Sequence, residues 1–208
     1  MLTRDRIDIF MVGEFDDYQV LQALHRFPLE GRQVDLQFSY SQPYVNVVKE
    51  KIEPRQSSQS ILQLGYQFPC QYGDKDYFAL IVFNAMFGEF AHSALFTTLR
   101  EKEGLAYSIS SQFDIFTGLL EVYAGIEKSN RDQAMRGISR ELNYIKLGRF
   151  SSSLLNQTKK IIRMNALLSE DHALTLVEQR FNKVIFGDKS LSLENWLDEI
   201  EKVTKKDV

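Results

Sequence analysis

An arginine and a tyrosine are the residues whose types and spacing best suit chemistry on a substrate. Arg100 lies at the end of a helical pattern, Gly104 follows it, and Tyr107 lies just inside the next strand pattern. A tight glycine turn would fold that strand back beside the helix end and bring the guanidinium and the phenol together. Both groups donate hydrogen bonds, and neither is a good base at neutral pH. We therefore expect such a pair to hold a peptide carbonyl or a developing oxyanion.

The same two residues also have a purely structural interpretation. A cation near a helix C-terminus interacts favourably with the helix dipole, which would account for Arg100. Alternation over residues 105–113 places Tyr107 on the same strand face as Leu105 and Ile109, where its ring would pack. Spacing alone favours this structural interpretation.

Other groups that could react lack the partners that catalysis needs. The sequence contains no HExxH, HxxEH, GxSxG, GxxxxGK[ST] or GxGxxG motif. Its three histidines, His25, His92 and His172, are far apart, and Glu89 with His92 makes half a zinc site at most. Cys70 has no basic neighbour in sequence that would lower the pKa of its thiol. We expect no catalytic residue and no metal ligand in this chain.

Length and composition indicate an ordinary folded chain of one large domain or two small ones. It has 208 residues, of which 44% are apolar and 25% charged. A net charge of -3 gives no general attraction to nucleic acid, and no apolar run approaches the roughly 18 residues of a membrane span. The single cysteine excludes an internal disulfide, so we expect a cytoplasmic location.

Apolar periodicity divides the chain into three parts. Residues 1–30 are predicted to form a strand at 7–12 and then a helix that ends before Pro28. Residues 31–57 are predicted to be a connecting segment with one short strand at 45–51, either a linker or an ordered wrap over the surface. Residues 58–208 are predicted to form the main domain.

The main domain is predicted to be α+β, with a mainly antiparallel sheet and helices packed on one face. Strands are expected at 62–68, 105–113 and 120–126, the last two joined by a hairpin turn over 114–118. Helices are expected at 77–90 and 91–103 and over most of the chain after residue 129. A capping box at Thr204 opens a last helix that is cut off at Val208, so we expect this domain to be truncated.

The segment from Leu99 to Ile109 resembles the Arg…Gly-Leu-Ala-Tyr signature of the M16 (insulinase or pitrilysin-like) zinc peptidases. Residues 87–96 are similar to that family's glycine-rich turn before Ser-x-Leu-Phe, although this chain keeps only Gly88 there. Residues 9–15 resemble the family's last strand, which runs into Val-Gly-Asp and a helix. The resemblance covers nearly the whole chain, and its specific part is the segment from the arginine to the tyrosine.

The resemblance implies a division of labour between two homologous halves that enclose a chamber. One half binds zinc through HxxEH and a distal glutamate, and the other contributes an arginine and a tyrosine that contact the substrate backbone. By resemblance this chain is the second, non-catalytic C-terminal-type half, with Arg100 and Tyr107 at the substrate-binding positions. Zinc is then expected only in a partner domain or chain, and residues 1–30 are the tail of a preceding M16-like unit.

Three functions agree with these observations. The first is the substrate-clamping half of an M16 metallopeptidase, inactive alone, whose partners are a peptide substrate and a zinc-bearing half, or a homo-oligomer. The second is a structural or scaffold subunit without a peptidase role, and the third is a plain peptide-binding module. Retention of both Arg100 and Tyr107 favours the first, whereas the depleted glycine turn at Gly88 favours the second. Neither nucleic acid nor a membrane is an expected partner.

Overall fold

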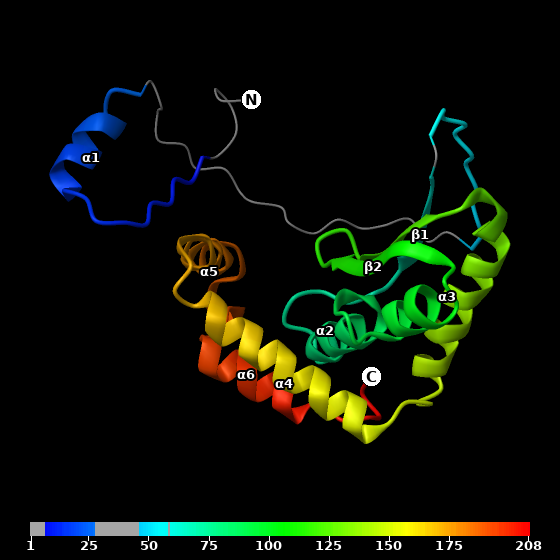
Figure 1. The fold of residues 1–208 in the computed structure, drawn as a ribbon. Helices are drawn as coiled ribbons and strands as arrows, with labels where there is room; N and C mark the ends of the chain where they lie inside the picture. The colour runs from blue at the N-terminus through cyan, green and yellow to red at the C-terminus, as the bar shows by residue number, and fades with distance from the viewer. Residues whose placement is uncertain (1–6, 28–45, 58) are drawn as a thin grey trace. The chain divides into compact units, whose positions relative to one another are not determined.

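The computed structural model describes residues 7–27, 46–57 and 59–208 (Figure 1). The chain divides into two compact units. The smaller unit comprises Met1–Ser39 and Ala166–Ser190, and the larger unit comprises Tyr40–Asn165 and Leu191–Val208. The predicted division at residues 30 and 57 remains a prediction.

A three-stranded antiparallel sheet forms the centre of the larger unit. Its order is β1 (Ser60–Gln67), β3 (Leu119–Ile126), β2 (Ala106–Asp114). Inward and outward side chains alternate along β1, as expected for a sheet with one covered face. The predicted hairpin turn joins β2 to β3. In it the Asp114 carboxylate accepts from the Phe116 N–H at 2.9 Å, and Gly118 adopts a φ of 62°.

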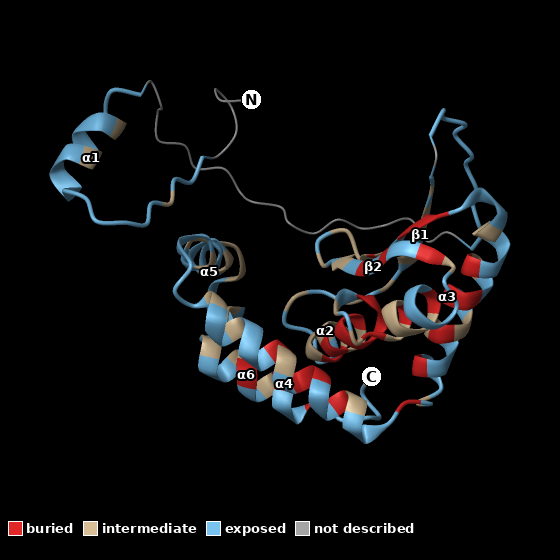
Figure 2. Ribbon diagram, viewed as in Figure 1, coloured by how far each residue is buried: buried red, intermediate tan, exposed pale blue. Residues whose placement is uncertain are grey.

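Helices cover one face of this sheet and enclose the core with it (Figure 2). The long apolar run predicted as one helix forms α2 (Tyr77–Asn84) and continues into a π-helix, η1 (Ala85–Glu89). A second π-helix, η2 (Phe96–Lys102), precedes β2. A 3-10 turn, η3 (Lys128–Asn130), then leads from β3 into α3 (Arg131–Lys146). The predicted α+β class with helices on one sheet face is confirmed.

Two further helices of the larger unit are joined by a buried lysine. These are α4 (Ser152–Ser169), most of which lies in this unit, and α6 (Leu193–Lys202). Lys159 is only 8% exposed, and its ammonium donates to the backbone carbonyl of Glu201 at 2.6 Å. The carbonyls of a last helical turn have no partner within the helix, so the lysine satisfies one of them and ties the two helices together.

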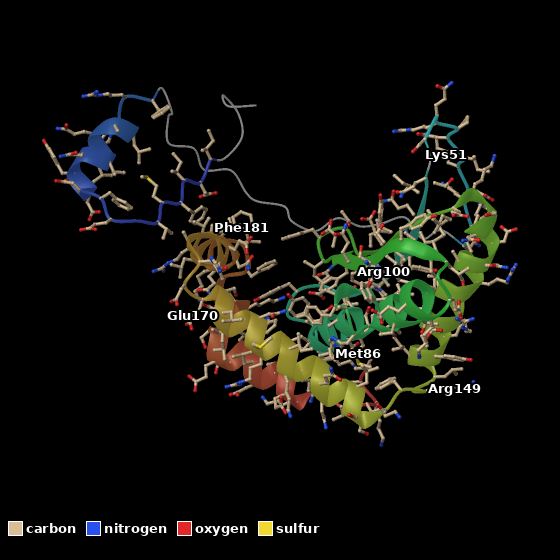
Figure 3. The ribbon with its side chains drawn as sticks, in the orientation of Figure 1. Lys51, Met86, Arg100, Arg149, Glu170 and Phe181 are labelled. Atoms are coloured by element: carbon tan, nitrogen blue, oxygen red, sulfur yellow. The ribbon has the colours of Figure 1, made fainter. Side chains whose placement is uncertain are left out.

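The smaller unit contains α1 (Asp17–Leu24), α5 (Ala173–Phe186) and a 3-10 turn, η4 (Gly187–Lys189). Asp16 caps α1, since its carboxylate accepts from the N–H groups of Tyr18 and Gln19. Neither helix has a buried residue. The ring of Phe10 meets that of Phe181, labelled in Figure 3, edge to face with centroids 6.2 Å apart.

Two predicted short strands are wrong over the residues that the structure describes. Residues 7–12 and 46–51 form neither strand nor helix, while Val45 lies outside the described residues. A strand needs a neighbour for its backbone hydrogen bonds, and alternation in sequence cannot supply one. An ion pair between Glu50 and Arg131 attaches the second segment to α3 instead.

Candidate functional site

The predicted glycine turn between η2 and β2 is present and positions both candidate residues. Gly104 adopts a φ of 62°, which only glycine takes without strain. The Glu103 N–H donates to the Thr98 carbonyl at 2.9 Å, and the Leu105 N–H donates to the Leu99 carbonyl at 2.8 Å. These bonds satisfy carbonyls that the end of a helix leaves free, so the chain reverses sharply into β2.

Arg100 is exposed on η2, close to this turn (Figure 3). The central carbon of its guanidinium lies 4.5 Å from the centroid of the Phe96 ring, one helical turn earlier. Such a cation–π contact holds the side chain over an aromatic face. Within residues 7–27, 46–57 and 59–208, the guanidinium makes no hydrogen bond or ion pair, so its donors face solvent.

Tyr107 is the extra residue of a β-bulge at the start of β2. Ala106 pairs with Ile126 and Ser108 pairs with Gly125, so no residue of β3 is left opposite Tyr107. The bulge reverses the alternation: Ala106 and Ile109 are buried, whereas Tyr107 is 50% exposed. The expectation that Tyr107 shares a face with Ile109 is therefore wrong, and its ring does not pack into the core beside that residue.

The hydroxyl of Tyr107 donates to the carboxylate of Glu127 at 2.6 Å. Glu127 directly follows Ile126, the residue that faces Ala106 across the ladder, so strand pairing brings the two side chains together. Hydrogen bonding to this carboxylate is the main reason that the pKa of Tyr107 lies above its ordinary value. Glu127 is a site residue that the sequence reasoning missed, and the register of the strand at 120–126 was the only signal for it.

The site is thus two exposed side chains on either side of a rigid turn, each with its own partner. Arg100 contacts Phe96, and Tyr107 contacts Glu127; the structure shows no hydrogen bond that joins Arg100 to Tyr107. Arg100 can only donate hydrogen bonds. Tyr107 has already donated its single proton, and its oxygen lone pairs remain. The arrangement suits binding of a polar backbone rather than proton abstraction.

The Glu89 and His92 pair is divided between two structural contacts. Glu89 accepts from the amide of the buried Asn84 at 2.9 Å, and Asn84 in turn accepts from the Ser111 hydroxyl at 2.8 Å. His92 Nε2 lies 2.9 Å from the Thr158 hydroxyl. Desolvation raises the pKa of Glu89 and lowers that of His92. In the described part of the chain, no group of three His, Cys, Asp or Glu side chains could hold a metal ion.

Cys70 lies in an environment that suppresses thiolate formation. Burial, and then the charges of Asp74 and Asp76, raise the pKa of its thiol to about 11. The Sγ atom lies 3.7 Å from the backbone carbonyl of Gln71, to which it donates. The thiolate is the nucleophilic form of cysteine, so this residue is poorly suited to catalysis.

Comparison with known proteins identifies the family of this chain. Residues 1–162 match the model that describes the peptidase M16 inactive domain. The chain belongs to the M16 peptidase family. The resemblance inferred from the segment around Arg100 and Tyr107 is therefore confirmed, and the chain is an inactive, C-terminal-like M16 domain without HxxEH.

Individual relatives agree with this assignment. "Probable inactive metalloprotease YmfF" of Bacillus subtilis (strain 168) is 36% identical over the whole chain, which covers 49% of that protein. A conserved protein from Enterococcus faecalis V583 is also 36% identical, with a TM-score of 0.84 over 93% of this chain and 46% of its own. The peptidase M16 inactive domain from Pseudomonas fluorescens shares the fold, with a TM-score of 0.61 and 22% identity over 73% of this chain and 36% of its own.

The M16 chain thus spans about half the length of YmfF. Among its described residues, no helix is both long enough and apolar enough to cross a membrane.

Proposed function

We propose that this M16 chain is the substrate-clamping half of a zinc peptidase, working with a zinc-bearing HxxEH domain or partner chain in peptide hydrolysis. The partner supplies zinc-activated water for attack on the peptide bond. This chain supplies Arg100 and Tyr107, which bind the substrate backbone near the bond that is cut. Alone, the chain is inactive.

One observation carries this proposal: both residues of the M16 signature are exposed on either side of a rigid turn. Gly104 fixes that turn, and the bulge turns Tyr107 outward although simple alternation would bury it. Bulges are common next to active sites because they re-aim a side chain. A tyrosine needed only for packing would not need this device.

The test combines peptide binding by the chain with proteolysis by the chain and its zinc-bearing partner. Arg100→Lys keeps the charge but loses the planar fork, so it should restore little of the activity that Arg100→Ala loses. If Arg100 stabilises the developing oxyanion, turnover should fall on the order of a hundredfold. Tyr107→Phe keeps the ring and should also lower turnover.

Matched variants on α3 provide the controls for these measurements. Arg136 and Tyr144 are exposed there, and Arg136→Lys and Tyr144→Phe should leave turnover unchanged. Thermal unfolding of each variant separates loss of function from loss of fold. Unchanged turnover in folded Arg100→Ala would refute the clamp.

A scaffold subunit without a peptidase role is the second candidate. YmfF, 36% identical to this chain, carries the description of an inactive metalloprotease. Under this function no zinc-bearing partner would confer proteolysis, and the Arg100 and Tyr107 variants would assemble normally. A cytoplasmic location remains part of the proposal and rests on the single cysteine.

A further inference from the structure

The hydrogen bond between Tyr107 and Glu127 determines which atom of a peptide the tyrosine can bind. A phenol has one proton to donate, and here that proton is given to the Glu127 carboxylate at 2.6 Å. We propose that Glu127 is a positioning residue that makes Tyr107 an acceptor for a peptide N–H, while Arg100 donates to a peptide carbonyl. This inference rests on the proposed function, because it specifies how the clamp reads a substrate backbone.

The backbone of the sheet holds the pair in place. Ala106 of β2 pairs with Ile126, the last residue of β3. Tyr107 follows Ala106, and Glu127 follows Ile126. Gly125 pairs with Ser108 in this ladder and leaves room for its side chain, since an added Cβ would lie 2.7 Å from the Ser108 hydroxyl oxygen. The hydroxyl and the carboxylate are therefore brought together by the ladder itself and by the bulge within it.

The charge on Glu127 strengthens this arrangement. A hydrogen bond to an ionised acceptor is shorter and stronger than a neutral one. Donation to a carboxylate also polarises the phenol oxygen, and a hydroxyl that donates becomes a better acceptor. A tyrosine phenol, with an ordinary pKa of about 10, keeps its proton at neutral pH, and Glu127 raises the pKa of Tyr107 further, so the direction of the bond is maintained.

A donor and an acceptor together are complementary to a peptide backbone. An extended peptide presents carbonyl oxygens and N–H groups, and the Arg100 guanidinium can bind only the former. Tyr107, held by Glu127, would bind an N–H, so the site would select substrates with a secondary amide at that position. A proline or an ester there has no N–H to donate. The substrate class is therefore a peptide in which the residue that supplies the bound N–H is not proline.

The first arm of the experiment needs no peptide. The ionisation of Tyr107 is followed by NMR of ring-labelled tyrosine in the chain, and Tyr107→Phe assigns its signal. Glu127→Gln and Glu127→Ala should both lower the pKa of Tyr107 toward the ordinary tyrosine value of about 10. Glu121→Gln removes a charge from the same strand, where Glu121 contacts Gln63 and Gln112 instead, and should leave Tyr107 unchanged. A Tyr107 titration that ignores Glu127 would overturn the positioning role and leave the clamp itself standing.

The second arm measures binding of a fluorescein-labelled, alanine-rich dodecapeptide in which each N–H is replaced in turn by an ester oxygen. In the wild-type chain, one ester should weaken binding about three- to tenfold, the effect of one net hydrogen bond. That penalty should vanish in Tyr107→Phe and shrink in Glu127→Ala. It should largely persist in Glu127→Gln, whose amide oxygen still accepts the phenol proton.

The outcomes separate the two proposals. An ester penalty that is equal in the wild-type chain and Tyr107→Phe would overturn N–H recognition by Tyr107, while binding that depends on Arg100 would still support the clamp. If the wild-type chain binds none of these peptides, the clamp fails and backbone recognition by Tyr107 fails with it. The NMR titration still reports the Tyr107–Glu127 bond by itself in that case.

Discussion

At the scale of single residues, what Arg100 and Tyr107 can offer to a ligand depends on the side chain that each one contacts. Tyr107 was expected to donate, but its proton is committed to Glu127. The guanidinium of Arg100, which was expected either to bind a carbonyl or to interact with the helix dipole, rests on the Phe96 ring and keeps its donors exposed. Both partners are supplied by the fold around the turn, and both change what the side chains offer to a ligand.

A prediction at this scale concerns Cys70. A pKa near 11 leaves roughly a hundredfold less thiolate at neutral pH than the ordinary thiol has. Its reaction with Ellman's reagent should therefore be slower than that of a small free thiol by about this factor. The rate should rise about tenfold per pH unit, because only the deprotonated form reacts. Rapid labelling at pH 7, or loss of peptide processing in a folded Cys70→Ser chain, would contradict this.

At the scale of elements, close contacts between helix and strand determine where the site residues lie. The π-helix η1 approaches β2 at Gly88, where a Cβ would lie 2.5 Å from the Ser111 hydroxyl oxygen and 2.7 Å from the Ser111 backbone nitrogen. Ser111 also bonds Asn84 of α2 at this point. The one glycine that the chain keeps in this glycine-depleted turn is therefore the one that this packing requires.

We accordingly expect Gly88→Ala to destabilise the fold by about 1 to 3 kcal/mol, as overpacking against backbone does. Ser111→Gly removes the clashing Cβ and hydroxyl but not the backbone nitrogen, so it should rescue the variant only in part. Gly65→Ala is the control, since its Cβ would meet only the end of the Leu119 side chain at 3.3 Å. Urea unfolding measures all three changes; equal stability of the Gly88 and Gly65 variants would contradict the tight contact.

At the scale of the whole molecule, the proposed function gives this chain a surface for a peptide substrate and gives the zinc chemistry to a partner. The sequence has no HxxEH, and the described residues hold no cluster of three metal-binding side chains. The chain matches about half of YmfF, a longer relative described as a probable inactive metalloprotease. This is the basis for assigning zinc to a partner in the proposed function.

Zinc content tests that assignment directly. After mild chelation and equilibration with zinc in the presence of a weak competing chelator, the chain should retain well under one zinc per molecule. Replacing both Glu89 and His92 by alanine should not lower the small amount of zinc that is retained. The two side chains hydrogen-bond separately, Glu89 to Asn84 and His92 to Thr158. Stoichiometric zinc measured by mass spectrometry would refute the assignment.

Much of the fold could be predicted because it follows local rules. Alternation located β1 and β3, and glycines at 104 and 118 marked turns that adopt positive φ angles. A continuous apolar run located α2, as expected for a helix buried on most sides, and an apolar stripe at helical spacing located α3. The predictions failed at 7–12 and 46–51, where a strand pattern has no pairing strand among the described residues.

The sequence by itself determined the family, the identity of the two signature residues and the lack of a zinc motif, since these depend on residue identity and short spacings. Only the tertiary structure decided which way Tyr107 faces and which side chain it hydrogen-bonds. One inserted residue in a strand reverses the face of the side chains on one side of it, and whether a residue is inserted depends on pairing with a distant strand. Pairing of β2 with β3 therefore turned Tyr107 outward and placed Glu127, 20 residues later, within 2.6 Å of its hydroxyl.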